Sequence, residues 1–350
     1  MSEPVPSHHA PGGGFRNPWP GARPWGYLHF LKWVIIDRLA REMASDPDPG
    51  VFRRVEPAYA TPRATDDVVT VTWVGHSTLL LQLGGLNIIT DPIWSERASP
   101  VSFAGPRRWV GPGIDFDALP PIDVILQSHN HYDHLDSRTV RRIAERHAGA
   151  TWLSPLGVGS LQRSWGARNV VELDWWEDRT IDGVRFACSP TQHQSARTLR
   201  DRGRTLWCSW SMLAGDRRVY FGGDSAYHPA FAEIGERYGP FDLALLPIGA
   251  YEPRWFMRVV HMNPEEAVRA FLDLHERHTA NPAAAMVPIH WGTFKLTDEA
   301  MDDPPRRIRK AWRDAGLPDD RLWLLAHGET RTLLADRAPE RRAASAISDR

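Results

Sequence analysis

A cluster of metal-binding side chains within six positions constrains this chain more than any other feature. His129, His131, Asp133 and His134 follow directly after residues 122–127, a short apolar run that is typical of a β-strand. Residues i and i+2 of an extended segment point the same way, so His129 and His131 can bind one ion together. After a bend, Asp133 and His134 can reach a second ion. Imidazole and carboxylate groups are ligands that zinc and similar divalent ions prefer.

Further candidate ligands stand at the ends of later strands. They are His193, after Thr191-Gln192, Asp224, after Gly222-Gly223, and His290, after residues 286–289. A carboxylate after two glycines suits a bridging ligand, because glycine lets the backbone approach closely. The sequence therefore predicts a centre that is assembled from the ends of several strands.

Strand and helix patterns alternate along the chain and indicate a layered α/β domain. The predicted strands are residues 69–74, 77–83, 86–90, 122–127, 219–221, 243–248 and 286–289, and the predicted helices are residues 137–147 and 264–278. We expect the metal-binding domain to span residues 68–335. It is preceded by a leader (1–22) and a helical or extended segment (23–67), and it is followed by a polar tail (336–350).

The leader is rich in Gly and Pro and the tail is polar, so disorder is expected in both. Residues 25–40 are apolar on much of their surface, with Trp25 and Trp33, and the pattern predicts a helix. The apolar run is interrupted by His29, Lys32, Asp37 and Arg38. Two interpretations of this helix remain open: it packs on the domain, or it touches a membrane surface.

Composition narrows the function classes. The chain has 350 residues, 42% hydrophobic and 24% charged, which is enough for a large core, and its net charge of −1 does not favour nucleic-acid binding. Cys188 and Cys208 are the only cysteines, so a disulfide scaffold or a cysteine-based zinc site is excluded. Neither a secretory signal nor a run of roughly 18 apolar residues is visible. We expect a cytoplasmic protein with at most peripheral membrane contact.

Longer phrases resemble the N-acylphosphatidylethanolamine-hydrolysing phospholipase D family of the metallo-β-lactamase superfamily. His-x-His-x-Asp-His followed by separate His, Asp and His is the superfamily pattern. The phrases closer to the phospholipase family are residues 74–78, 90–93, 128–136, 172–177, 239–257, 261–267 and 289–294, with 17–20 and 31–33 in the leader region. The resemblance covers about residues 15–332.

This resemblance implies an αββα sandwich, two mixed β-sheets flanked by helices, with two Zn²⁺ ions at one edge; other divalent transition metals stay open. His129, His131 and His193 would bind the first ion, Asp133, His134 and His290 the second, and Asp224 would bridge them. The implied reaction is metal-dependent phosphodiester hydrolysis. A hydroxide held between the metals would convert N-acylphosphatidylethanolamine to N-acylethanolamine and phosphatidic acid.

Several other polar residues have two interpretations. His261 matches a family histidine and would contact the substrate phosphate, or it caps or packs the following helix. His76 supports the metal site or shapes a turn. Asp91 is expected to orient a metal-binding histidine rather than to bind metal, and Asp136 could play the same part.

Rival functions also remain. A lactonase or another phosphodiesterase, such as one acting on nucleotides, could carry the same metal pair, since function depends on the site and not on the fold. A catalytically silent lipid-binding protein is a second alternative, which the complete ligand set argues against. The animal enzymes have aromatic residues where this chain has Ser137 and Gln194, so the acyl-chain side of the site stays undetermined. A homodimer is compatible with the sequence.

Overall fold

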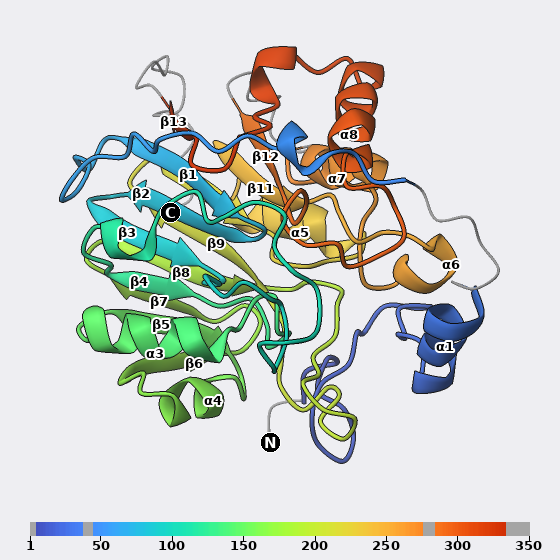
Figure 1. Ribbon diagram of the computed structural model, residues 1–350. Helices are drawn as coiled ribbons and strands as arrows, with labels where there is room; N and C mark the ends of the chain where they lie inside the picture. The colour runs from blue at the N-terminus through green and yellow to red at the C-terminus, as the bar shows by residue number, and fades with distance from the viewer. Residues whose placement is uncertain (1–4, 38–44, 276–283, 334–350) are drawn as a thin grey trace.

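Two β-sheets stacked face to face form the centre of the protein (Figure 1). The computed structural model describes residues 5–37, 45–275 and 284–333. One sheet has seven strands in the order β13-β1-β2-β3-β4-β5-β6, and the other has six in the order β12-β11-β10-β9-β8-β7. The strands of the first sheet are β1 (Val69–Gly75), β2 (Thr78–Leu83), β3 (Leu86–Thr90), β4 (Val124–Leu126), β5 (Thr151–Pro155), β6 (Asn169–Leu173) and β13 (Thr330–Leu333). Those of the second are β7 (Asp178–Ile181), β8 (Val184–Ser189), β9 (Ser209–Ala214), β10 (Arg217–Phe221), β11 (Leu243–Pro247) and β12 (Ala285–Ile289).

Helices cover the outer faces of both sheets. The α-helices are α1 (Tyr27–Leu31), α3 (Ser137–Arg146), α4 (Gly159–Ser164), α5 (Ala230–Tyr238), α6 (Arg254–Met257), α7 (Pro264–Asp273) and α8 (Asp303–Asp314). Short turns are the π-helical η1 (Lys32–Asp37) and the 3-10 segments η2 (Pro49–Val51), η3 (Phe116–Ala118) and η4 (Asp319–Arg321). In Figure 1, α3 and α4 lie beside the seven-stranded sheet, and α5, α7 and α8 lie beside the six-stranded one. The predicted αββα sandwich is confirmed.

Strand β2 shows why the sheets are buried on both faces. Leu79 and Leu81 belong to the core between the sheets, whereas Leu80 packs with Val140 and Ile143 of α3 on the outer face. Successive side chains of a strand point to opposite faces, so an unbroken apolar run requires cover on each side. The run Leu79–Leu81 therefore places one sheet between a second sheet and a helical layer.

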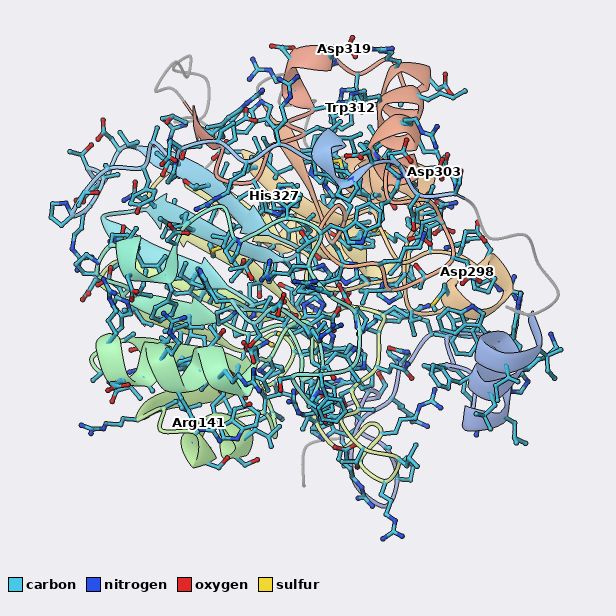
Figure 2. All side chains as sticks on the ribbon, in the orientation of Figure 1. Arg141, Asp298, Asp303, Trp312, Asp319 and His327 are labelled. Atoms are coloured by element: carbon cyan, nitrogen blue, oxygen red, sulfur yellow. The ribbon has the colours of Figure 1, made fainter. Side chains whose placement is uncertain are left out.

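The α7–α8 pair closes the far side of the six-stranded sheet. Trp312 of α8 is fully buried, and its ring centre lies 4.9 Å from that of Phe271 in α7 (Figure 2). Its indole N–H donates to the Pro318 carbonyl, which satisfies the one polar atom of this large side chain. A capping box between Asn263 and Glu266 starts α7.

Parallel pairing decides where the functional loops meet. Strands β3, β4, β5 and β6 pair in parallel, as do β10, β11 and β12, and the remaining pairs are antiparallel. The carboxyl ends of parallel strands lie at the same edge of a sheet. The loops after β4, β10 and β12 consequently lie at one edge of the sandwich.

Most predicted elements are present with small shifts of their ends. Strand β4 is shorter than the predicted 122–127. The helix predicted over 264–278 ends at Asp273, with Leu274 as its C-cap, and residues 276–278 lie outside the described part. The helix predicted over 25–40 is α1 continued by η1; residues 38–40 and the tail 336–350 lie outside the described residues. Among the helices that are described, none is long and apolar enough to cross a bilayer.

The prediction of a disordered leader is wrong for residues 5–22. Trp19 stacks on His228 with ring centres 4.6 Å apart, and Asn17 donates a hydrogen bond to the carbonyl of His193. These contacts come from residues far along the chain, so the local Gly and Pro content could not reveal them. Residues 1–4 lie outside the described part.

Candidate metal centre

The first predicted ligand set converges at the common edge of the sheets. His129 Nε2 lies 2.8 Å from His131 Nδ1, and His193 Nε2 lies 3.2 Å from the same His131 nitrogen. Asp224 Oδ2 lies 3.8 Å from His129 Nε2 and 3.7 Å from His193 Nε2. Their ligand atoms all lie within 4.8 Å of one another, a spacing that one ion can fill.

The second set lies next to the first and shares Asp224. Asp133 Oδ2 lies 3.4 Å from both His134 Nε2 and His290 Nε2. Asp224 reaches this set as well, with Oδ2 3.1 Å from His134 Nε2 and Oδ1 3.2 Å from His290 Nε2. The Asp224 carboxylate therefore lies between the two sets, where a bridging ligand belongs.

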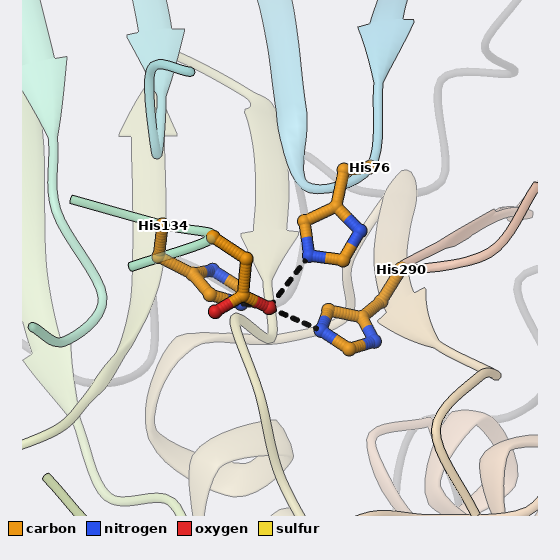
Figure 3. Close-up of side chains that lie close together, drawn as sticks. His76, His134 and His290 are labelled. Carbon is orange, nitrogen blue, oxygen red and sulfur yellow. Dashed lines mark hydrogen bonds and ion pairs between the residues drawn. The ribbon is translucent and has the colours of Figure 1, made fainter. Parts of the chain in front are cut away.

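His76, at the β1–β2 turn, belongs to the second set. Figure 3 shows His76 and His290 approaching one carboxylate oxygen, and His76 Nε2 lies 3.0 Å from Asp133 Oδ2. The turn role is also present, because His76 has a φ of 57° and its carbonyl accepts from the indole N–H of Trp73. Both interpretations left open by the sequence apply to this residue.

Unpartnered buried atoms test whether these residues fit a metal. His134 Nε2, His290 Nε2 and Asp224 Oδ1 are buried and make no hydrogen bond. Leaving a buried polar group unpaired costs about 1–3 kcal/mol, and more for a charged group. Three such atoms facing one another are explained by cations that bind them, and imidazole with carboxylate is a suitable donor set for a divalent transition metal.

The electrostatics of the centre also suit metal binding. Burial lowers the pKa of His129 well below its usual range and that of His131 to about 3, so both imidazoles are neutral. Burial also disfavours protonated His290, but the Asp224 carboxylate outweighs it and raises the pKa to about 9. Burial raises the pKa of Asp224 itself, yet neighbouring His134 and His290 hold it well below its ordinary value. Carboxylates that draw protons onto adjacent imidazoles would bind a cation in their place.

Asp91 orients the His134 ring through its Nδ1 atom. Its Oδ2 lies 2.7 Å from His134 Nδ1 and accepts from the Ser128 hydroxyl at 2.5 Å, and its Oδ1 accepts from the Ser128 and Gln127 N–H groups. This contact directs the His134 Nε2 lone pair toward the centre. Asp136 does not share the role: it accepts from the backbone N–H groups of Arg138 and Thr139 and caps α3, so that prediction is wrong.

Gly223 allows the close approach expected before Asp224. It has a φ of +56°, and a Cβ there would lie 2.6 Å from the Cβ of Ser128. A side chain at this position would push the Asp224 loop away from the loop after β4, which carries Ser128 and His129.

Comparison with known proteins supplies the family. A model described as "Beta-lactamase superfamily domain" matches residues 86–291, more than half of the chain. The chain belongs to the metallo-β-lactamase superfamily. With its fold and its His/Asp clusters, this superfamily member is a metal-dependent hydrolase.

Several known proteins are similar to this chain over most of their length. An uncharacterized protein of Mycobacterium tuberculosis is 42% identical over 80% of this chain and 73% of the relative. A Caenorhabditis elegans protein named N-acyl-phosphatidylethanolamine-hydrolyzing phospholipase D 1 is 36% identical over 85% of both chains. A metallo hydrolase structure from Ignicoccus hospitalis covers 76% of this chain and 99% of its own, with a TM-score of 0.56 and 21% identity, and supports the fold.

His261 lies beside the candidate metal centre. Its Nδ1 is buried without a hydrogen bond and lies 4.0 Å from Asp224 Oδ2, and its ring stacks on that of His290. The N-cap of α7 is Asn263, so the helix-capping interpretation of His261 is wrong. Burial lowers its pKa well below the usual range and keeps it neutral.

The sequence did not predict one residue that supports the loop of the metal ligands. Arg197 donates from Nη1 to the carbonyls of Asn130 and Leu135, both at 2.8 Å, and its guanidinium lies 3.9 Å from the centre of the Tyr132 ring. Nothing in the local pattern around Arg197 signals this role. By contrast, Asn17, which contacts the His193 carbonyl, lies in a leader phrase that resembles the phospholipase family.

Proposed function

We propose that this hydrolase is a two-zinc phosphodiesterase that cleaves N-acylphosphatidylethanolamine to N-acylethanolamine and phosphatidic acid. The observation that carries the two-ion part is Asp224, whose oxygens lie within 3.2 Å of a histidine from the second set and within 3.8 Å of histidines from the first. The substrate part is supported by the C. elegans relative, which carries that activity in its name.

The residues around the two ligand sets have separate roles in the proposed reaction. Bound at these two sets, zinc ions would supply a hydroxide at neutral pH and neutralise charge on a phosphoryl group. Asp133 is held by His76, and His134 is held by Asp91, so two ligands of the second set are fixed before any ion binds. His261, neutral and next to Asp224, offers a ring N–H to a phosphate oxygen of the substrate.

A substrate panel tests the proposal. The full-length protein should release phosphatidic acid and N-acylethanolamine from an N-acylated phospholipid, and mass spectrometry detects both products. A chelator should abolish this release. The panel also contains bis(p-nitrophenyl) phosphate, a lactone and a cyclic nucleotide. Turnover of the lactone or the nucleotide, with no phosphatidic acid from any N-acylated phospholipid, would leave only a metallohydrolase. Binding of the lipid without turnover of any compound would instead favour the non-catalytic alternative.

The N-terminal helix supports contact with a lipid surface. One side is fixed to the domain: Trp33 is buried among Met257, Val259 and Val260, and the Trp25 indole N–H donates to the Trp255 carbonyl. The other side presents apolar residues to solvent, which are Leu28, Phe30, Ile35 and Ile36, with Leu28 78% exposed. We propose that this apolar side enters the interface of a phospholipid membrane, which would bring the substrate to the protein.

Exchanging Leu28 and Ile36 for Ser should weaken binding to phospholipid vesicles by about tenfold or more, since burying one large aliphatic side chain contributes roughly 1.5–3 kcal/mol. Co-sedimentation of the full-length protein with phospholipid vesicles measures this binding. Point variants are preferable to a deletion, because residues 5–22 also contact the metal centre through Asn17. Phe103→Ser, at an exposed apolar residue elsewhere that is 81% accessible, is the matched control. Equal sedimentation of all three proteins would remove this role from the helix.

A further inference from the structure

A third group of metal-binding side chains lies where the leader meets the domain. His8 Nε2 lies 2.6 Å from Asp174 Oδ1, and His9 Nε2 lies 2.7 Å from Asp174 Oδ2. One ligand atom of each residue lies within 4.8 Å of those of the other two. His8 is buried, while the side chain of His9 is 30% exposed, so the group is covered by protein on one side and open to water on the other.

The backbone is shaped to bring these two histidines together. Adjacent residues of a strand point to opposite faces, so two consecutive imidazoles do not ordinarily reach one carboxylate. Here a turn, closed by a hydrogen bond from the His9 N–H to the Pro6 carbonyl, interrupts the extended path. An antiparallel bridge between His9 and Phe15, with a bond from the Arg16 N–H to the His8 carbonyl, then forms a hairpin over residues 8–16.

Asp174 is oriented independently of the histidines. Its Oδ1 accepts from the Trp175 N–H at 2.8 Å, and its own N–H donates to Glu177 Oε2 at 2.8 Å. The His8 ring stacks on Trp175 with ring centres 4.3 Å apart. Both the carboxylate and one imidazole are thus held in place by neighbours that are not ligands, which is a property of built metal sites.

We propose that His8, His9 and Asp174 bind a further divalent transition-metal ion, with zinc as the first candidate, which fastens the leader hairpin to the domain. Two imidazoles and one carboxylate form the ligand set of open zinc sites, and the exposed side leaves a position for water. The ion would join segments that are 166 residues apart. It would also stabilise the segment that carries Asn17, the residue that contacts the His193 carbonyl.

Metal content tests this site. The full-length protein and a His8→Gln/His9→Gln double variant are dialysed against the same low concentration of zinc, and bound zinc per chain is measured by elemental analysis. We expect the double variant to hold about one equivalent less, since removing two of three ligands abolishes a site of this kind. His29→Gln, which removes an exposed histidine on α1, is the matched control and should keep the wild-type zinc content.

A second variant and a second readout protect the test against misfolding. Asp174→Asn keeps the shape of the side chain and should also lose about one equivalent. Zinc should slow proteolytic cleavage within residues 5–22 of the wild-type protein and have no such effect on the double variant. Equal zinc content in the wild-type protein and in both variants, all with the same near-ultraviolet circular dichroism, would overturn the site and leave a hydrogen-bonded triad. The comparison is a difference, so it does not depend on how many ions the main centre holds.

Discussion

Asp224→Asn is expected to lower turnover by roughly a thousandfold or more while the fold persists, which corresponds to a loss of several kcal/mol of transition-state stabilisation. Among the carboxylates in the described part of the chain, Asp224 alone lies within 4 Å of histidine nitrogens from both ligand sets. The neutral amide of Asn would remove the negative charge that two bound cations would need and would replace one of the two carboxylate oxygens by an N–H donor. Steady-state rates on the best compound of the panel, with zinc in excess, measure the effect.

Asp242→Asn is a matched control for this variant. Asp242 is also a buried carboxylate of the six-stranded sheet, but it precedes β11 and accepts from the Arg218 N–H near the start of β10, whereas Asp224 follows the end of β10. A change at Asp242 should affect the melting temperature more than turnover. Wild-type rates in Asp224→Asn, measured with both sets loaded, would show that Asp224 is not a bridging ligand.

Asp91→Asn should weaken zinc binding at the main centre by roughly 10- to 100-fold, the usual effect of removing a group that orients a metal ligand. All four hydrogen bonds at the Asp91 carboxylate come from Ser128, Gln127 and the His134 ring. An amide NH₂ must face one pair of these donors. If it faces His134 Nδ1, that nitrogen becomes the acceptor, and the proton moves to Nε2, the atom that should bind metal.

Competition with a chromophoric chelator measures the zinc affinity of this variant. Asp136→Asn is the matched control, because Asp136 lies in the loop that carries His134. Its carboxylate caps α3 and contacts no ligand histidine in the described structure. It should cost about 1 kcal/mol of stability, as the loss of a helix cap does, with unchanged zinc affinity. Equal affinities in Asp91→Asn and Asp136→Asn would show that Asp91 does not direct His134.

Local pattern was enough to predict much of the fold. Runs of apolar and β-branched residues placed β1, β2, β3, β11 and β12 to within a few residues, because strands that are buried on both faces favour apolar side chains on both. The predicted strand over residues 122–127 is longer than the observed β4. Its neighbours in sequence, Ile122 and Gln127, are equally buried but do not pair as strand residues, and a hydropathy pattern cannot separate these cases.

The sequence by itself determined the candidate ligands. The spacing of His129, His131, Asp133 and His134 after an apolar strand needs only the strand period to indicate a metal, and His193, Asp224 and His290 are recognisable because each follows a predicted strand or apolar run. Only the tertiary structure decided how these residues are supported. His76 reaches Asp133 across 57 residues and His8 reaches Asp174 across 166, and no periodicity along the chain relates such pairs. The order of strands brings His76 and Asp133 together, because loops at one edge of a sheet become neighbours whatever their separation in sequence. The packing of the leader hairpin on Trp175 brings His8 to Asp174.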